Sequence, residues 1–187
     1  MNLKIKISAR HIHLTKKDFA KLFGDTKMIR EVELTQPGQF ASNLYVDVKN
    51  GDKIFKHIRV VGPIREYTQL EISKTDAHAL KIKPPVRNSG DLRNAVMIEI
   101  IGPKGSISRE CAIIASRHIH ITNDALLTSK LNGHEKVKIK ISGEKGGIID
   151  NVYVKPTPLA TYELHLDLDD ANSHLLNNDD EVEIILD

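Results

Sequence analysis

The sequence contains one cysteine, no tryptophan and few aromatic residues, and each shortage excludes a class of protein. A single cysteine, Cys111, cannot form an internal disulfide, which favours a reducing compartment. Its place in the apolar run 111–115 predicts a small buried side chain rather than a nucleophile. Aromatic residues make up 4% of the chain. This is too few for the stacking surfaces of single-stranded nucleic-acid binders.

A large excess of one charge sign and long apolar runs are also lacking. The 187 residues include 27 basic and 25 acidic ones, a net charge of +2, and the two signs are interspersed. A nucleic-acid partner is therefore not expected, whereas the small basic excess suits an anionic small molecule. No apolar run approaches the ~20 residues of a membrane span, and the first residues do not read as a signal peptide. We therefore expect no membrane partner and a cytoplasmic protein.

Short segments in which apolar and polar residues alternate make up most of the chain. Residues 3–7, 137–141 and 181–184 show this period of two, which is typical of half-buried antiparallel strands. Turn signals separate the segments, as in Asn50-Gly51-Asp52, and this regular punctuation favours barrels or sandwiches. The sequence thus predicts a mainly β fold.

A few short helices should interrupt the strands. Thr15 is a suitable N-cap for a helix that ends at Gly24, and Thr122 and Gly133 bracket a second segment, 123–132. Two further helices are predicted at 74–80 and near 169–176.

The main organisational feature is an internal repeat. Residues 8–15 read Ser-Ala-Arg-His-Ile-His-Leu-Thr, and residues 115–122 read Ala-Ser-Arg-His-Ile-His-Ile-Thr. An apolar strand precedes each copy and a Thr-capped helix follows it. Duplication explains this better than chance, so we expect two equivalent halves with one His-x-His motif each.

The two His-x-His motifs are candidate metal sites. Side chains at i and i+2 of an extended segment point to the same face, so His11 with His13, and His118 with His120, can each converge on one ion. Neutral imidazole is a favoured zinc ligand. An isolated His-x-His is more often a pair of strand histidines without a ligand, but repetition in the same flanks favours metal.

Each pair needs at least one further protein ligand. Nearby carboxylates are candidates, and so are the other histidines, namely His57, His78, His134, His165 and His174. His165 lies in a segment with the alternation of a β-strand, just before an acidic segment. Glu71 shares a strand face with Gln69, although alone it would be read as a solvated glutamate.

Arginines near these motifs suggest anion binding. Arg10 and Arg117 each precede a histidine pair, and Arg65 follows the turn at Gly62-Pro63. A guanidinium can grip phosphate with two hydrogen bonds, whereas a surface charge is the alternative reading of each arginine. The loop 84–91 could offer backbone N–H groups and Ser89 to an anion, or it could be an ordinary connection. Nucleophile-elbow, Walker and Cys-x-x-Cys motifs do not occur.

Taken together, these segments resemble the zinc-dependent phosphotransacylases of the PduL type, also called phosphate propanoyltransferases. The two repeat motifs match, as do four further blocks in the family's order, so that the resemblance covers essentially the whole chain: 36–41 (Gln-Pro-Gly-Gln-Phe-Ala), 62–73, 85–91 and 163–172.

The resemblance implies two β-barrels capped by short α-helices, with the active site between the barrels. The first strand joins the C-terminal barrel in this family, so barrel 1 would comprise residues 1–9 and 116–187 and barrel 2 residues 10–115. It also implies two zinc ions per chain. Carried over residue by residue, one ion is held by His11, His13 and Glu71, and the other by His118, His120 and His165.

The family's catalytic, phosphate-binding arginine falls on Arg65, and Ser89 lies in its phosphate-side loop. The implied reaction converts a short-chain acyl-CoA (propanoyl-CoA or acetyl-CoA) and phosphate into acyl phosphate and coenzyme A. The residues that bind coenzyme A are not identified. Glu66 and Tyr67 stand where the family usually has a basic or polar pair, which puts the coenzyme A contacts and the acyl preference in doubt.

Two rival functions use the same residues. A zinc-dependent thioesterase or other hydrolase would activate water instead of phosphate, and a structural zinc protein would close each ion with a fourth protein ligand. The acyl chain, the oligomeric state (a homodimer would be ordinary) and any microcompartment association stay open. Only ten residues precede His11, so the targeting extension of microcompartment members is not expected, and a free cytoplasmic location is favoured.

Overall fold

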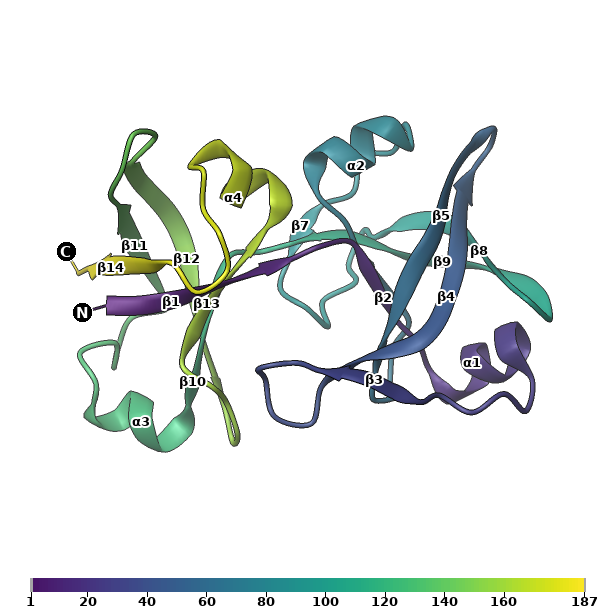
Figure 1. The fold of residues 1–187 in the computed structure, drawn as a ribbon, viewed down its shortest axis with the longest axis horizontal. Coiled ribbons are helices and arrows are strands. Elements are labelled where there is room, and N and C mark those ends of the chain that lie inside the picture. The colour runs from purple at the N-terminus through teal and green to yellow at the C-terminus, as the bar shows by residue number, and fades with distance from the viewer. Residues whose placement is uncertain (1, 187) are drawn as a thin grey trace. The chain divides into compact units, whose positions relative to one another are not determined.

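The computed structural model describes residues 2–186, and these form a mainly β protein with four short helices in the described part (Figure 1). The strands are β1 (Asn2–Ser8), β2 (His11–His13), β3 (Arg30–Glu33), β4 (Phe40–Asn50), β5 (Lys53–Gly62), β6 (Gln69–Glu71), β7 (Val86–Arg87), β8 (Val96–Gly102), β9 (Gly105–Ala115), β10 (His118–Thr122), β11 (Lys136–Ile141), β12 (Gly147–Thr157), β13 (Glu163–Asp167) and β14 (Glu181–Ile185). The helices are α1 (Lys16–Phe23), α2 (Lys74–Ala79), α3 (Asn123–Thr128) and α4 (Leu168–Ser173).

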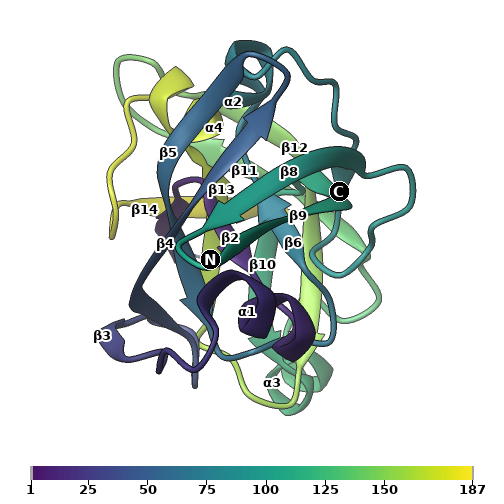
Figure 2. The same ribbon diagram turned by 90° about the vertical axis from the view of Figure 1, so that its right-hand side faces the viewer.

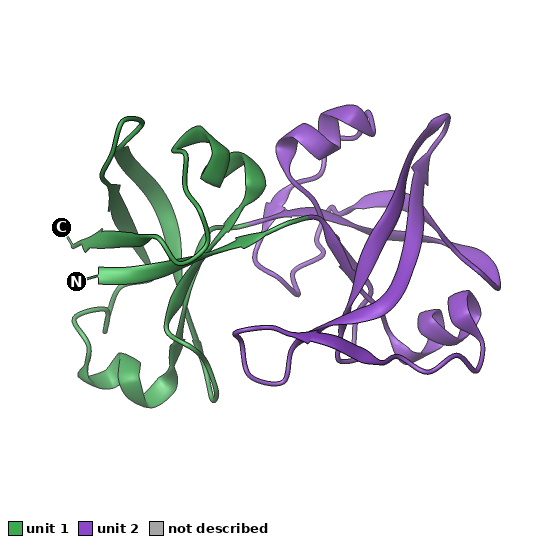
Figure 3. Ribbon diagram, viewed as in Figure 1, with its two compact units in different colours: residues 1–9, 116–187 green, residues 10–115 purple. Residues whose placement is uncertain are grey.

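The chain divides into two compact units (Figure 3). Unit 1 comprises residues 1–9 and 116–187, and unit 2 comprises residues 10–115. In unit 1, six strands close a barrel in the order β1-β13-β10-β12-β11-β14. In unit 2, the path β4-β5-β2-β6-β9 is closed by β8, which pairs with both β4 and β9, while β3 and β7 are added at the sides. The predicted fold class, mainly β with two barrels, is confirmed.

The two barrels have the same strand arrangement. Strand β10 pairs in parallel with β12 and antiparallel with β13, and β2 pairs in parallel with β5 and antiparallel with β6. The correspondence continues around the ring, with β1 of unit 1 matching β9 of unit 2. The internal duplication seen in the sequence is therefore also present in the fold.

Each repeat is shared between the two units. Strand β1 belongs to unit 1, but β2, which follows it directly, belongs to unit 2. In the second copy β9 belongs to unit 2 and β10 to unit 1. Each barrel therefore takes its His-x-His strand from one copy of the repeat and the preceding apolar strand from the other.

Each unit has its own apolar core, formed by the inward positions of the alternating strands. Leu3, Ile5 and Ile139 are at most 2% exposed in the core of unit 1, and Ile58 and Leu70 are fully buried in that of unit 2. Burial of such side chains contributes about 1.5–3 kcal/mol each to folding. Alternation thus sets which face of each strand is left for polar side chains.

The prediction that the strands are antiparallel is wrong for several pairs. Strand β1 runs parallel to β13, and β2, β6 and β10 each have one parallel neighbour. Alternation reports only that one face is buried and carries no information on the direction of the neighbour. These parallel neighbours are not joined by hairpins, since parallel pairing needs a longer connection.

The helices start at or within one residue of the predicted positions, but α3 and α4 end several residues earlier. The Oγ1 atoms of Thr15 and Thr122 accept the N-capping hydrogen bonds of α1 and α3. Helix α1 ends at Phe23 with Gly24 as its C-cap, as expected, and α2 spans 74–79, one residue shorter than the predicted 74–80. Helix α3 stops at Thr128 instead of 132, because the Ser129 hydroxyl bonds to local backbone groups and turns the chain. Helix α4 likewise ends at Ser173 instead of 176.

Helix α1 packs against β8 and β9 of unit 2 (Figure 2). A Cβ atom at Gly102 would lie only 2.5 Å from the carbonyl oxygen of Leu22, so glycine allows this close approach. Among residues 2–186, none of the helices is both long and apolar enough to cross a membrane.

Candidate metal centres of the two units

The histidine pairs project from the barrel strands on the face opposite the core. Ile12 and Ile119, the middle residues of the two motifs, are fully buried in the apolar cores. Because side chains alternate along a strand, the histidines on either side of each isoleucine share the other face. His13 and His120 are nevertheless only 3% and 7% exposed. They are therefore buried polar side chains, and a buried ring nitrogen without a hydrogen-bond partner or a metal ion is unfavourable.

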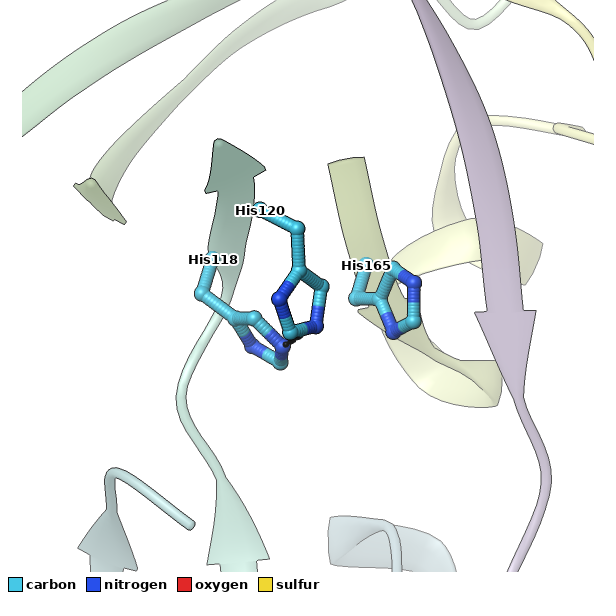
Figure 4. Close-up of side chains that lie close together, drawn as sticks. All are labelled: His118, His120 and His165. Carbon is cyan, nitrogen blue, oxygen red and sulfur yellow. Dashed lines mark hydrogen bonds between the residues drawn. The ribbon is translucent and has the colours of Figure 1, made fainter. Parts of the chain in front are cut away.

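In unit 1 the strand register supplies the third candidate ligand. Strand β13 pairs with β10 so that His165 lies opposite His118. The Nε2 atoms of His118 and His120 are 3.1 Å apart, and the His165 ring centroid lies 5.1 Å and 4.6 Å from those of His118 and His120. Figure 4 shows the three imidazoles gathered in one cluster.

Unit 2 contains the equivalent cluster with one chemical change. Strand β6 places Glu71 opposite His11, in the register that His165 has opposite His118. Oε2 of Glu71 lies 3.7 Å from Nε2 of His11, and the rings of His11 and His13 are in T-shaped contact at 5.0 Å. The structure therefore gathers all six predicted ligands into two groups of three.

Hydrogen bonds leave metal-binding lone pairs in both groups. Nδ1 of His118 lies 2.8 Å from the Ser116 carbonyl oxygen, and Nδ1 of His13 lies 3.0 Å from that of Val61. A carbonyl oxygen only accepts, so Nδ1 carries the proton in each ring and Nε2 keeps its lone pair. This is the arrangement in which a protein-bound imidazole binds a metal ion.

Burial keeps two of the histidines neutral. Desolvation, followed by the charge of the neighbouring His11, lowers the pKa of His13 to about 3. Desolvation, followed by the charges of His118 and His165, lowers the pKa of His120 to about 2. Nδ1 of His120 is buried and has no hydrogen-bond partner in the described residues. Neutral rings close together in this way favour a cation and disfavour protons.

The donor sets suit a divalent ion such as zinc. The candidate ligand atoms of each group lie within 4.8 Å of one another. Three imidazoles, or two imidazoles and a carboxylate, are donor sets found in catalytic zinc sites, where three protein ligands leave one position open. The other candidate histidines, His57, His78, His134 and His174, belong to neither group among residues 2–186.

Arg65 lies beside the cluster of unit 2. Its backbone N–H donates to the carbonyl oxygen of Leu14 at 2.9 Å, which fixes it next to the end of the segment that carries His13. Its charge contributes to the lowered pKa of His13. Its Nη1 donates to the Tyr67 hydroxyl at 3.3 Å, whereas its buried Nε has no partner in the described residues. The guanidinium thus retains donors for an anion.

Ser89 is linked to the same cluster through Gln69. Nε2 of Gln69 donates to Glu71 Oε1 at 2.6 Å and to Ser89 Oγ at 2.8 Å. The backbone N–H of Gly90 donates to Gln69 Oε1 at 2.7 Å. The loop 85–91 is therefore held against the strand that carries Glu71.

The repeated arginines Arg10 and Arg117 each form an ion pair with an aspartate of their own unit. Arg117 makes two hydrogen bonds of 2.7 Å to Asp170, the third residue of α4, and Arg10 donates to Asp76, the third residue of α2, at 2.8 Å. Each arginine therefore ties a His-x-His segment to the helix that follows the strand of the third ligand. Arg10 is also exposed, as the surface-charge reading expects, whereas the Arg117 side chain is partly buried in its ion pair with Asp170.

We expect the substitution Asp170→Asn to destabilise the protein without changing the ligands themselves. It removes one charged acceptor from a half-buried bidentate pair, which should lower the free energy of unfolding by about 1–3 kcal/mol. Thermal unfolding of the metal-free protein measures this effect. The exposed ion pair of Lys140 and Glu183 offers a control, since Glu183→Gln should change stability by less than about 1 kcal/mol. An unchanged midpoint in Asp170→Asn would show that the pair does not contribute.

Several site residues could not be identified from the sequence. Asp76 and Asp170 are ordinary first-turn acids of short helices, and their arginine partners are 66 and 53 residues away. Gln69 and Glu163 lie two residues before the third ligand of each group. That spacing puts them on the ligand face of the strand, which was the one available signal for both.

Comparison with known proteins shows the family of this chain. Residues 4–177 match the family model described as phosphate propanoyltransferase. The phosphate propanoyltransferase of Rhodopseudomonas palustris is 37% identical over 182 residues, covering 96% of this chain and 80% of that protein. Those of Thermotoga maritima and Priestia megaterium are both 39% identical, covering 97% and 93% of this chain and 88% and 81% of the relatives. These matches confirm the resemblance found in the sequence, and the chain belongs to the phosphate propanoyltransferase family of acyltransferases.

Proposed function

We propose that this protein is a phosphotransacylase that transfers a short acyl group between coenzyme A and phosphate, with a zinc ion in each of the two ligand groups. The observation that carries the proposal is Arg65, whose buried Nε lacks a partner in the described residues and whose charge reaches His13. An anion-binding donor beside a metal-ligand cluster suits a reaction in which phosphate is a substrate. Family membership supports the same reaction.

In this proposal Arg65 binds and orients phosphate. Two N–H groups of a guanidinium match two phosphate oxygens, and fixing the nucleophile beside the thioester replaces a bimolecular encounter with an oriented one. The Tyr67 hydroxyl steadies the guanidinium, and Ser89 adds a hydroxyl from the loop that Gln69 holds. A bound zinc ion supplies electrostatic stabilisation for the negative charge that develops on the thioester oxygen.

The acyl group passes directly from sulfur to phosphate. A phosphate oxygen forms the new bond to the carbonyl carbon, the carbon–sulfur bond breaks, and coenzyme A leaves as the thiolate. Cys111 takes no part, because it is 1% exposed and burial raises its pKa to about 12. This buried state agrees with the role predicted for Cys111 from the sequence.

Dependence on phosphate separates this function from a zinc-dependent thioesterase. Thiol release from acetyl-CoA and propanoyl-CoA should require phosphate and should yield the acyl phosphate in equal amount. A hydrolase would release thiol at the same rate without phosphate and would yield the free acid. That outcome, with the metal content unchanged, would exclude acyl transfer and establish the alternative.

The same assay with a series of acyl-CoAs measures the acyl preference. Acetyl and propanoyl groups differ by one methylene, which is worth about 1–3 kcal/mol in an apolar pocket. We therefore expect activity with both, and we propose that the reaction takes place in the cytoplasm.

A further inference from the structure

We propose that Glu163 and Gln69 are equivalent positioning residues, each of which orients the third metal ligand of its unit through one hydrogen bond. The inference rests on the metal sites of the proposed function, but it concerns residues outside the two ligand groups. It assigns to each site its own outer hydrogen-bonding partner.

Strand register makes the two residues equivalent. Glu163 lies opposite His120 in the pairing of β13 with β10, and Gln69 lies opposite His13 in the pairing of β6 with β2. Both side chains are almost inaccessible to solvent, with Glu163 2% and Gln69 0% exposed. A buried carboxylate or amide has a high cost unless it is hydrogen-bonded, so its partner indicates its role.

In unit 1, Glu163 orients an imidazole. Nε2 of His165 lies 2.8 Å from Oε1 of Glu163, and because a carboxylate oxygen only accepts, Nε2 carries the proton of this hydrogen bond. Donation from Nε2 leaves the lone pair of His165 on Nδ1. A carboxylate behind a ligating histidine fixes its tautomer and ring orientation and makes the ring a better donor to the metal.

In unit 2, Gln69 orients a carboxylate. Its Nε2 donates to Oε1 of Glu71 at 2.6 Å, while the other oxygen of Glu71, Oε2, lies 3.7 Å from Nε2 of His11. One oxygen of the ligand is thus held from behind and the other is turned to the histidine. Further hydrogen bonds to Ser89 and Gly90 fix the amide itself.

The two outer residues differ in the way that their ligands require. A carboxylate ligand needs a donor behind it, and Gln69 provides an N–H. An imidazole ligand needs an acceptor, and Glu163 provides an oxygen. From unit 2 to unit 1, the third ligand changes from a glutamate to a histidine. The residue two positions before it changes from a glutamine to a glutamate.

Zinc affinity of single-site proteins tests this assignment without measuring acyl transfer. In a His11→Ala background, where only the site of unit 1 remains intact, Glu163→Ala should weaken zinc binding by about 10–100-fold in a competition with a chelator. Glu163→Gln should retain most of the affinity, because its amide oxygen still accepts from His165. Glu183→Ala, an exposed glutamate on β14 of the same barrel, is the control.

The matching test for unit 2 uses a His118→Ala background. There Gln69→Leu, which keeps the approximate volume and removes the donor, should weaken zinc binding by about 10–100-fold. When the two backgrounds are exchanged, so that each outer variant is combined with the intact site of the other unit, zinc binding should be unchanged.

The outcomes distinguish this inference from the proposed function. If Glu163→Ala and Gln69→Leu bind zinc as tightly as their parent proteins, the positioning roles are wrong, whatever the protein catalyses. An equal loss in Glu163→Gln and Glu163→Ala also contradicts the role given to the acceptor. If the losses and the rescue occur but phosphate-dependent transfer is absent, the positioning roles stand and the proposed reaction is wrong. Thermal unfolding of the metal-free variants identifies a loss of affinity that comes from misfolding, and such a loss would count against a positioning role.

Discussion

Replacing His118 by alanine is expected to lower the zinc content by about one ion per chain and the rate of acyl transfer by at least about 10³-fold. The substitution removes one of three ligands, and the two remaining imidazoles cannot retain the ion at ordinary free zinc concentrations. Loss of several kcal/mol of transition-state stabilisation corresponds to a factor of this size. Metal analysis and the phosphate-dependent thiol-release assay measure the two effects.

The equivalent substitution in unit 2, His11→Ala, should have the same consequence. His134→Ala provides the matched control, because His134 belongs to unit 1 and to neither ligand group. It should retain two zinc ions and full activity. Retained turnover in a metal-free double variant of His11 and His118 would contradict the proposed chemistry.

Replacing Arg65 by alanine should lower kcat/KM for phosphate by about 10²–10³-fold, with a much smaller change in zinc content. Arg65 binds and orients phosphate in our proposal, and loss of one such electrostatic donor has an effect of this order. Arg65→Lys should recover only part of the loss, because lysine keeps the charge without the planar pair of N–H donors. Steady-state kinetics with phosphate as the varied substrate measure both variants.

Arg93, whose side chain is 83% exposed, is the control for loss of a positive charge. Arg93→Ala should leave the kinetic constants for phosphate within about twofold of wild type. If Arg65→Ala raised the KM for acyl-CoA and left that for phosphate unchanged, Arg65 would instead be a coenzyme A contact, and its assignment to phosphate would be wrong.

Much of the fold and the candidate ligands could be predicted from the sequence because their signals are local. The duplicated motif requires only the comparison of two octapeptides, and period-two alternation marks the strands. The N-cap residues Thr15 and Thr122 mark where α1 and α3 begin. Glu71 and His165 are less distinctive, and the resemblance to a family was needed to select them from the other candidates.

The remaining features depend on pairing between distant residues, which a single sequence does not specify. Arg10 and Arg117 have the same flanks as ligands would, but their partners are aspartates that only the tertiary fold brings close. The assignment of β1 to unit 1 and β2 to unit 2 is likewise a matter of strand pairing, which the local pattern does not mark and which only the resemblance to a family implied. Gln69 and Glu163 were missed as positioning residues for the same reason.

Titration of the metal-free protein with zinc tests the central claim most directly. Phosphate-dependent acyl transfer should be absent at the start and should rise with added zinc until two equivalents per chain are bound. Full activity before zinc is added would contradict the account. So would activity that does not rise in step with the zinc bound by the six ligand residues.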